Sequence, residues 1–379
     1  MVESKNWSSG VRKMRDFYAI KPNAGIHQQE FGFYAMDRWK SEGHIAENVT
    51  QAELDELFGF DQPGLFSLGG LGWCEGGFVP TFEEHWIRDE GDSYEIVQDF
   101  AGRHVKYFKG RRQGFMPEYV DHPVKDMKTW EELCKWRLDP KTPERQPRIA
   151  NTVAKARQAE LEGKVICQNL VGGYMYLRSL MGPLDLMYLL YDDPDLIHDC
   201  MKTWFNLADA VIAQHQEHVT LDDIYIGEDI CYNHGLLISK DMVREFLFPY
   251  YQQLLANAKK RQLDPTRKIY FHLDTDGFSD EALPLYQEIG MNYLSPFEVA
   301  SGCDVVRTGR DYPELLISGG FDKRIMAAGK EAIDREIERI MPIMYRRGGY
   351  IPTCDHGVPE EVSFENYMHY RKRMLEFAK

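Results

Sequence analysis

The stretch from Lys268 to Gly277 (KIYFHLDTDG) places a histidine and two aspartates at the end of a run of β-branched and aromatic residues. Such a run is typical of a buried strand. Because residues two apart on a strand point to the same face, we expect His272 and Asp274 to face the same site. Imidazole and carboxylate groups can hold a metal or move a proton, and Asp276 is a further candidate for catalysis, substrate binding or shaping the turn.

A metal site requires more donors, and two later strand-like runs supply them. Glu298 is the last residue of MNYLSPFE, and Cys354 lies within GYIPTCDH. With His272 and Asp274 they would give one nitrogen, one sulfur and two carboxylate ligands, a set that zinc accepts in a tetrahedron. The alternatives are a hydrogen-bonded His–Asp pair at the strand end and a buried structural thiol at Cys354.

Two further carboxylates stand side by side in GEDICYNHG. Adjacent strand residues face opposite ways, so only one of Glu228 and Asp229 is expected to enter the site. A carboxyl in a partly dry pocket beside other carboxylates has a raised pKa and can act as a general acid. The alternative is a solvated or arginine-paired carboxylate. His234, in the same loop, is a candidate for substrate binding.

Candidates for substrate binding also occur in NLVGGYMYLRSLMG and at the last strand-like run. The pair Gly172–Gly173 fits a tight strand-to-helix turn, and Arg178 could bind a carboxylate or phosphate. Tyr174 suits the wall of an aromatic pocket, and His356 closes the last run. The glycine-rich segment 67–80 lacks a lysine at nucleotide-loop spacing, so we expect a loop near the mouth of the site.

Elements that could position these residues follow from the alternation of strand-like and helical segments after about residue 160, which predicts βα units and a parallel sheet. We expect an α/β (β/α)8 TIM barrel, whose chemistry lies at the carboxyl ends of the strands. Six strands are predicted at 164–170, 222–230, 268–277, 291–298, 315–322 and 349–356. Two more are expected near 76–87 and 104–110. Residues 1–75 are expected to form a mostly helical extension over one end of a barrel spanning 76–379.

Composition excludes several classes of protein. The 379 residues carry a formal net charge of −15, which argues against a nucleic-acid partner. No apolar run approaches the roughly 20 residues of a membrane span, and the N-terminus lacks an apolar signal core. Seven cysteines without CxxC pairs indicate reduced thiols. We therefore expect a cytoplasmic protein that binds a small molecule, with a homodimer possible.

Several of these stretches together resemble the uroporphyrinogen decarboxylase superfamily. The similarity runs through LRSLMG, YDDPDLIHD, GEDICYNHGLLISKDMVREFLFPYY, the segment FHLDTDG to IERIM, and GGYIPTCDHGVPEEVSFENYMHY, and it covers about residues 80–379. The resemblance implies a (β/α)8 barrel. It also implies one of two activities: decarboxylation of uroporphyrinogen, or transfer of a methyl group to or from a corrinoid cofactor.

Within the superfamily, the sequence is closer to the methyltransferase branch. It lacks the arginine-rich N-terminal segment of the decarboxylases, and its charge disfavours a substrate with eight carboxylates. The methyltransferases carry a zinc motif of His-x-Cys and a later Cys. His272 and Cys354 match the outer ligands, Asp274 replaces the middle cysteine, and Glu298 resembles a carboxylate kept beside the metal. An oxygen ligand suits the polarising of an ether oxygen better than the activation of a thiol.

The resemblance therefore implies a methyltransferase that takes a methyl group from a methoxylated aromatic small molecule. The acceptor would be the cobalt(I) of a corrinoid (cobalamin) on a separate protein, because this chain has no D-x-H-x-x-G segment. Zinc, or an acid such as Glu228, would activate the leaving oxygen. Two alternatives stay open: a metal-free lyase in which Asp274 or Asp276 steadies a ring intermediate, and a non-catalytic corrinoid-binding component.

Overall fold

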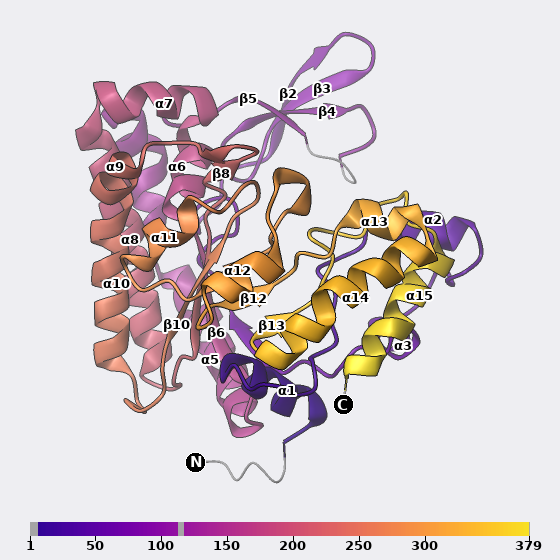
Figure 1. Cartoon of the computed structure of the whole chain (residues 1–379). Coiled ribbons are helices and arrows are strands. Elements are labelled where there is room, and N and C mark those ends of the chain that lie inside the picture. Colours follow the sequence, from indigo (N-terminus) through magenta and orange to yellow (C-terminus); the bar gives the residue numbers. More distant parts are fainter. Residues whose placement is uncertain (1–6, 113–116, 379) are drawn as a thin grey trace.

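Seven parallel strands curl into the central sheet of the molecule (Figure 1). The computed structural model describes residues 7–112 and 117–378. Neighbouring strands follow the order β1 (Leu65–Leu68), β6 (Val165–Val171), β7 (Asp223–Gly227), β10 (Tyr270–Asp274), β11 (Tyr293–Ser295), β12 (Leu316–Ser318) and β13 (Tyr350–Ile351). The six strands predicted after residue 160 are all present, in parallel register. The fold is the predicted α/β, TIM-barrel-like one, with seven barrel strands among the described residues.

The two additional barrel strands were predicted wrongly. The seventh strand is β1, which pairs with β6. Segments 76–87 and 104–110 instead contribute to a separate antiparallel sheet that projects beside the barrel (Figure 1), made of β2 (His85–Glu90), β3 (Tyr94–Gln98), β4 (His104–Phe108) and β5 (Glu118–Asp121). A small hairpin of β8 (Cys231–Tyr232) and β9 (Gly235–Leu236) follows β7.

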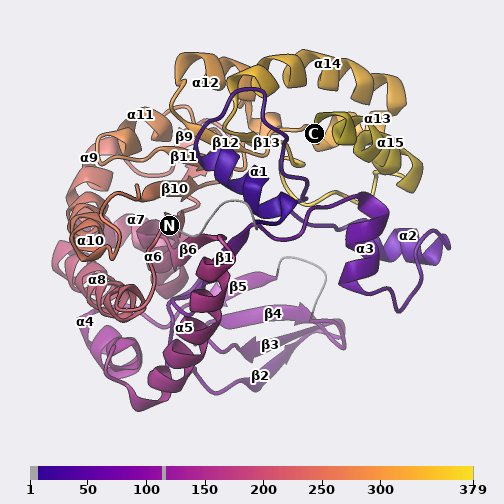
Figure 2. The ribbon, with the colours of Figure 1, turned by 90° about the horizontal axis from the view of Figure 1, so that it is seen from below.

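Helices surround most of the sheet, and the β2–β5 sheet occupies the remaining side (Figure 2). They are α4 (Met127–Thr129), α5 (Gln146–Leu161), α6 (Gly173–Met181), α7 (Pro183–Asp192), α8 (Pro194–Gln216), α9 (Lys240–Met242), α10 (Phe248–Arg261), α11 (Ala282–Gln287), α12 (Val305–Asp311), α13 (Lys323–Ala328), α14 (Lys330–Arg347) and α15 (Phe364–Met374). Asp193 and Ser363 cap α8 and α15 through their side chains, as an acceptor before a first turn should. None of the described helices is long and apolar enough to cross a membrane.

The N-terminal region contributes α1 (Ser9–Tyr18), α2 (Met36–Ser41) and α3 (Gln51–Phe58). Helix α1 lies across the amino ends of the strands (Figure 2), where Met14, Phe17 and Tyr18 form an apolar cluster with strand residues. The Tyr18 hydroxyl donates a hydrogen bond of 2.6 Å to Asp223. The helix thus closes the bottom of the barrel and leaves the carboxyl end open. Strand β1 lies within residues 1–75, so the barrel sheet begins before the predicted boundary; a division into two domains stays a prediction.

Candidate active site

Three aspartates lie together where β7 and β10 end. The Asp276 N–H donates a 3.5 Å hydrogen bond to Asp229, and Asp229 also accepts from Arg178 at 3.2 Å. Burial, together with the charges of Asp229, Asp274 and Glu298, raises the pKa of Asp276 to about 7. The mouth of the barrel therefore carries a carboxyl group that is partly protonated at neutral pH.

Alternation along the chain separates Glu228 from Asp229. Asp229 adopts the left-handed conformation (φ 47°), which costs energy for a residue with a side chain and directs it into the mouth. Glu228 is 0% exposed and accepts hydrogen bonds from the Tyr174 N–H (2.8 Å) and the Tyr251 hydroxyl. It caps α6 outside the mouth, so its position does not suit the acid role that the sequence suggested for it.

His272 and Asp274 share a face of β10, as predicted from their spacing. The imidazole Nε2 lies 2.8 Å from the Ser295 hydroxyl, which donates its proton to Asp274. The ring stacks on Tyr293 with centroids 3.5 Å apart, and its Nδ1 lies 3.6 Å from Asp223. His272 therefore belongs to a buried polar network in the barrel interior, and Asp274 forms the upper end of this network.

The four predicted zinc ligands are not assembled as one donor set. Glu298 accepts a 3.0 Å hydrogen bond from the Gly277 N–H and lies 3.6 Å from the Lys323 ammonium. Cys354 is buried, and its Sγ lies 3.9 Å from Asp355. Across residues 7–112 and 117–378, no group of three or more His, Cys, Asp or Glu side chains is arranged to hold a metal. The residues do not fit the predicted zinc site.

His356 connects the mouth to the N-terminal region. Its Nε2 lies 3.8 Å from an Asp276 carboxylate oxygen, and its Nδ1 lies 3.4 Å from the Tyr34 hydroxyl. The ring also packs against Phe31, with centroids 5.0 Å apart. Sequence reasoning did not identify Phe31 or Tyr34, because a contact across 322 positions leaves no local signal. The N-terminal region thus reaches the rim of the mouth as well as the bottom of the barrel.

The glycine-rich loop lies near the mouth, as expected. Trp73 at its tip is 56% exposed and stacks on Tyr225, with centroids 5.8 Å apart and planes within 6°. Gly70 and Gly72 take positive φ angles, and a Cβ at Gly72 would collide with the Glu75 carbonyl. Tyr225 faces Asp274, so the pair places an aromatic surface beside the carboxylates.

The remaining candidates for substrate binding differ in how close they lie to the carboxylates of the mouth. Arg178 uses one nitrogen for Asp229 and the Met175 sulfur, which leaves other N–H donors near the mouth. Tyr174 is buried, and burial raises the pKa of its hydroxyl to about 12, so it acts there as a neutral group. His234 lies exposed on the β8–β9 hairpin with its ring against Tyr232, and no contact brings it to the carboxylates.

A curled parallel sheet with acidic groups and an aromatic surface at its carboxyl end is the arrangement of a TIM-barrel-like enzyme. Residues 100–376 match the family model "Uroporphyrinogen decarboxylase (URO-D)", and the chain belongs to that family, which is enzymatic.

Individual similarities are more distant. The chain is 21% identical over 191 residues to a uroporphyrinogen decarboxylase of Hydrogenobaculum sp., covering 50% of this chain and 51% of that one. It is 29% identical over 177 residues to the Rhodococcus erythropolis protein of the same name, covering 43% and 45%. The chain spans about half the length of these curated relatives. A solved methyltransferase from Methanosarcina mazei shares the fold, with a TM-score of 0.53, 15% identity and coverage of 98% and 100%.

Proposed function

We propose that this protein transfers a methyl group from a methoxylated aromatic small molecule to the cobalt(I) of a corrinoid on a separate protein. The observation that carries the proposal is the carboxyl group of Asp276, half-buried at the barrel mouth beside Asp229 and with a pKa of about 7. Breaking an ether bond requires a proton for the departing oxygen, and a carboxyl group titrating near neutral pH suits that task.

The chemistry at this chain is a proton transfer. As the O–CH3 bond breaks, its electron pair stays on the oxygen, and Asp276 gives its proton to that oxygen, so a neutral phenol leaves. A cobalt(I) corrinoid, when bound with its carrier protein, supplies the electron pair that accepts the methyl group. Arg178 pairs with Asp229 next to Asp276, and the Trp73–Tyr225 surface holds the aromatic ring.

The charge of the mouth favours an ether over a polycarboxylate substrate. Asp229, Asp274, Asp276 and Glu298 interact with one another there, and the nearby cations Arg178 and Lys323 are already paired with two of them. A substrate with many carboxylates would be repelled by this surplus of negative charge. The Methanosarcina mazei protein that shares the fold is a methyltransferase, which supports the proposal.

The direct test mixes the purified protein with cob(I)alamin, as a surrogate acceptor, and a panel of methoxybenzoates and methoxyphenols under anaerobic conditions. The expected result is loss of the cobalt(I) absorption in step with release of the demethylated phenol. Carbon dioxide release from a pyrrole carboxylate, without any demethylation, would instead support the lyase alternative. Failure of both reactions, with ligand binding intact, would favour a non-catalytic component.

A Trp73→Ala variant is expected to raise KM for aromatic methyl donors about tenfold, because loss of a stacked ring costs about 1–2 kcal/mol. Turnover at saturating donor should change much less, since Trp73 is not placed at the reacting oxygen. The matched control is Trp86→Ala on the projecting sheet, because Trp86 is equally exposed at 56%. Equal effects of the two substitutions on KM would contradict the assignment of Trp73 to the substrate pocket.

A further inference from the structure

We infer that a second cavity, on the flank of the barrel, binds a small organic phosphate or a similar dianion. The cavity has a volume of about 60 Å³ and opens between the exit of β1, the start of α5 and the face of α8. A single water needs roughly 10–15 Å³, so the cavity can admit a small anion. Its lining residues include Gly69, Gly70, Arg145, Arg148, Ile149 and Val211. None of these belongs to the carboxylate cluster at the mouth.

Arg145 is a buried cation that forms no ion pair with a carboxylate among the residues that the structure describes. The residue is 3% exposed, and it donates hydrogen bonds to the backbone carbonyls of Asp139 (3.1 Å) and Arg137 (2.7 Å). Burial and the neighbouring charge of Arg148 lower the pKa of Arg145 to about 10, and the charge of Asp139 offsets only part of this effect. Burying a charge without an ion-pair partner is costly, so an anion that pairs with Arg145 would be bound favourably.

Arg148 places a second guanidinium in the same cavity. It is exposed, and its side chain forms no ion pair with an acid among residues 7–112 and 117–378. Both arginines lie at the start of α5, a helix of 16 residues whose N-terminal dipole also favours negative charge. Across the cavity, a Cβ at Gly69 or Gly70 would meet nothing within 4 Å, so the opposite wall leaves room for a ligand.

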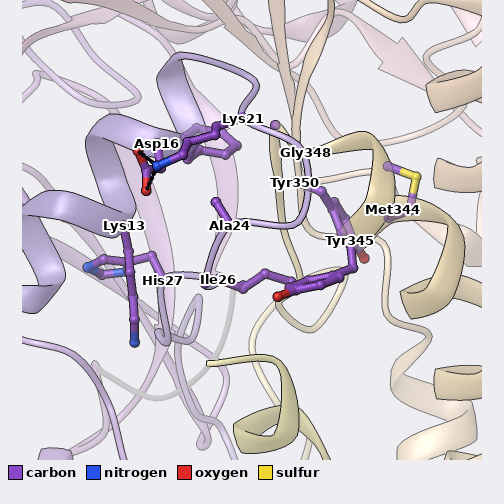
Figure 3. A pocket seen from close by; sticks show the side chains of 13 residues that line it. Lys13, Asp16, Lys21, Ala24, Ile26, His27, Met344, Tyr345, Gly348 and Tyr350 are labelled. Carbon is purple, nitrogen blue, oxygen red and sulfur yellow. Dashed lines mark hydrogen bonds and ion pairs between the residues drawn. The ribbon is translucent and has the colours of Figure 1, made fainter. Parts of the chain in front are cut away.

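In the cavity between α1 and α14, lysine side chains are paired with aspartates (Figure 3). Lys21 there pairs with Asp16 at 3.1 Å, and Lys13 pairs with Asp61 at 2.9 Å. These cations have their counter-charges within the protein. In the flank cavity, by contrast, neither Arg145 nor Arg148 forms an ion pair with an acid among the residues that the structure describes.

The lining also indicates the chemical class of the ligand. Two guanidinium groups offer paired N–H donors, which match the oxygens and the double charge of a phosphate monoester. Val79, Ile149 and Val211 line the remainder of the cavity and favour an apolar group attached to the anion. The inference does not depend on the methyl-transfer proposal.

The test is calorimetric titration of the whole protein with inorganic phosphate and with phenyl phosphate, at fixed ionic strength adjusted with sodium chloride. Phenyl phosphate is expected to bind more tightly than inorganic phosphate, and both should raise the melting temperature. Arg148→Met should weaken binding about tenfold, since a charge-assisted hydrogen bond is removed. Arg148 is the better choice for substitution because Arg145 also holds two backbone carbonyls.

The matched control is Arg157→Met, which removes the same charge from an exposed position of the same helix outside the cavity. Equal weakening by the two variants would overturn the inference, because the loss of affinity would then come from the lower net charge alone. Heat signals that chloride alone reproduces would overturn it as well. Equal affinity for the two phosphates would overturn the apolar part of the assignment. None of these outcomes depends on demethylation, so the proposed function stands or falls separately.

Discussion

An Asp276→Asn variant is expected to lose about a hundredfold or more in the rate of demethylation at pH 7. The amide keeps the size and the N–H contact to Asp229 but cannot donate a proton to the departing oxygen, and a positioned general acid contributes about 10²–10⁴ in rate. The measurement is single-turnover release of phenol with cob(I)alamin in excess. Binding of the methoxy compound, followed by calorimetry without cobalamin, should remain within a few-fold of wild type.

The pH profile gives a second, independent signature of the same group. The active form of Asp276 is protonated, and its pKa is about 7. The wild-type rate is therefore expected to be level below pH 6 and to fall about tenfold per pH unit above pH 8. The slow Asp276→Asn reaction should lack this fall. Asp280→Asn is the control, because Asp280 lies on the same loop but pairs with Arg307. A fall with pH that persists in the Asp276 variant would assign the proton to another group.

The fold could be predicted from the sequence where the burial of a strand determines which of its residues are apolar. Strand β6 (VICQNLV) is buried along nearly its whole length and is apolar except at Gln168 and Asn169, as in parallel sheets covered on both faces. Strand β2 (HWIRDE) is largely exposed, which is typical of an antiparallel sheet with one face in solvent. That difference distinguishes the projecting sheet from the barrel, and the prediction did not use it. Strand β1 has only four residues and precedes a glycine-rich loop, so its local signal is weak.

The site could be predicted only where it depends on neighbours in the chain. Spacing predicted that His272 and Asp274 share a face and that Glu228 and Asp229 do not. Spacing cannot show that Ser295 lies between His272 and Asp274, since that contact joins β10 to β11. The rim contacts of His356 with Phe31 and Tyr34 are likewise set by tertiary structure. The residue types of His272, Asp274, Glu298 and Cys354 therefore suggested a zinc site, but the packing does not bring the four side chains together.

Removing the Glu228 side chain is expected to cost about 3–5 kcal/mol of unfolding free energy. The carboxylate is fully buried and accepts from the Tyr174 N–H and the Tyr251 hydroxyl, and the Tyr251 hydroxyl in turn accepts from the Gly173 N–H at 2.6 Å. In Glu228→Ala these donors face a cavity without an acceptor, a combination that is among the most destabilising single changes. Urea unfolding at pH 6 measures the loss. A cost below about 1 kcal/mol would show that the network contributes little.

Glu228→Gln separates charge from packing through the pH dependence of stability. Burial raises the pKa of Glu228 to about 7 from its ordinary value of 4.5. The folded protein therefore holds this proton more tightly than the unfolded chain, so the stabilisation is complete below about pH 4.5 and is lost as pH rises through 7. The difference between a pKa of about 7 in the folded protein and 4.5 in the unfolded chain corresponds to about 2.5 kcal/mol between pH 5 and pH 8.

Glu30, buried against the Cys354 N–H and the Tyr367 hydroxyl, has a pKa raised in the same way to about 7. Asp276, whose pKa is also about 7, contributes to the decline of the unfolding free energy from pH 5 to pH 8 in the same way, whereas His215, whose pKa burial lowers to about 4, opposes it. Glu228→Gln should therefore lose about 2.5 kcal/mol less than wild type over this range. Glu217→Gln, at an exposed position, should follow wild type. A Glu228→Gln curve parallel to wild type would mean that Glu228 stays ionised in the folded protein. Its hydrogen bonds to Tyr251 and the start of α6 would then outweigh the cost of burying its charge.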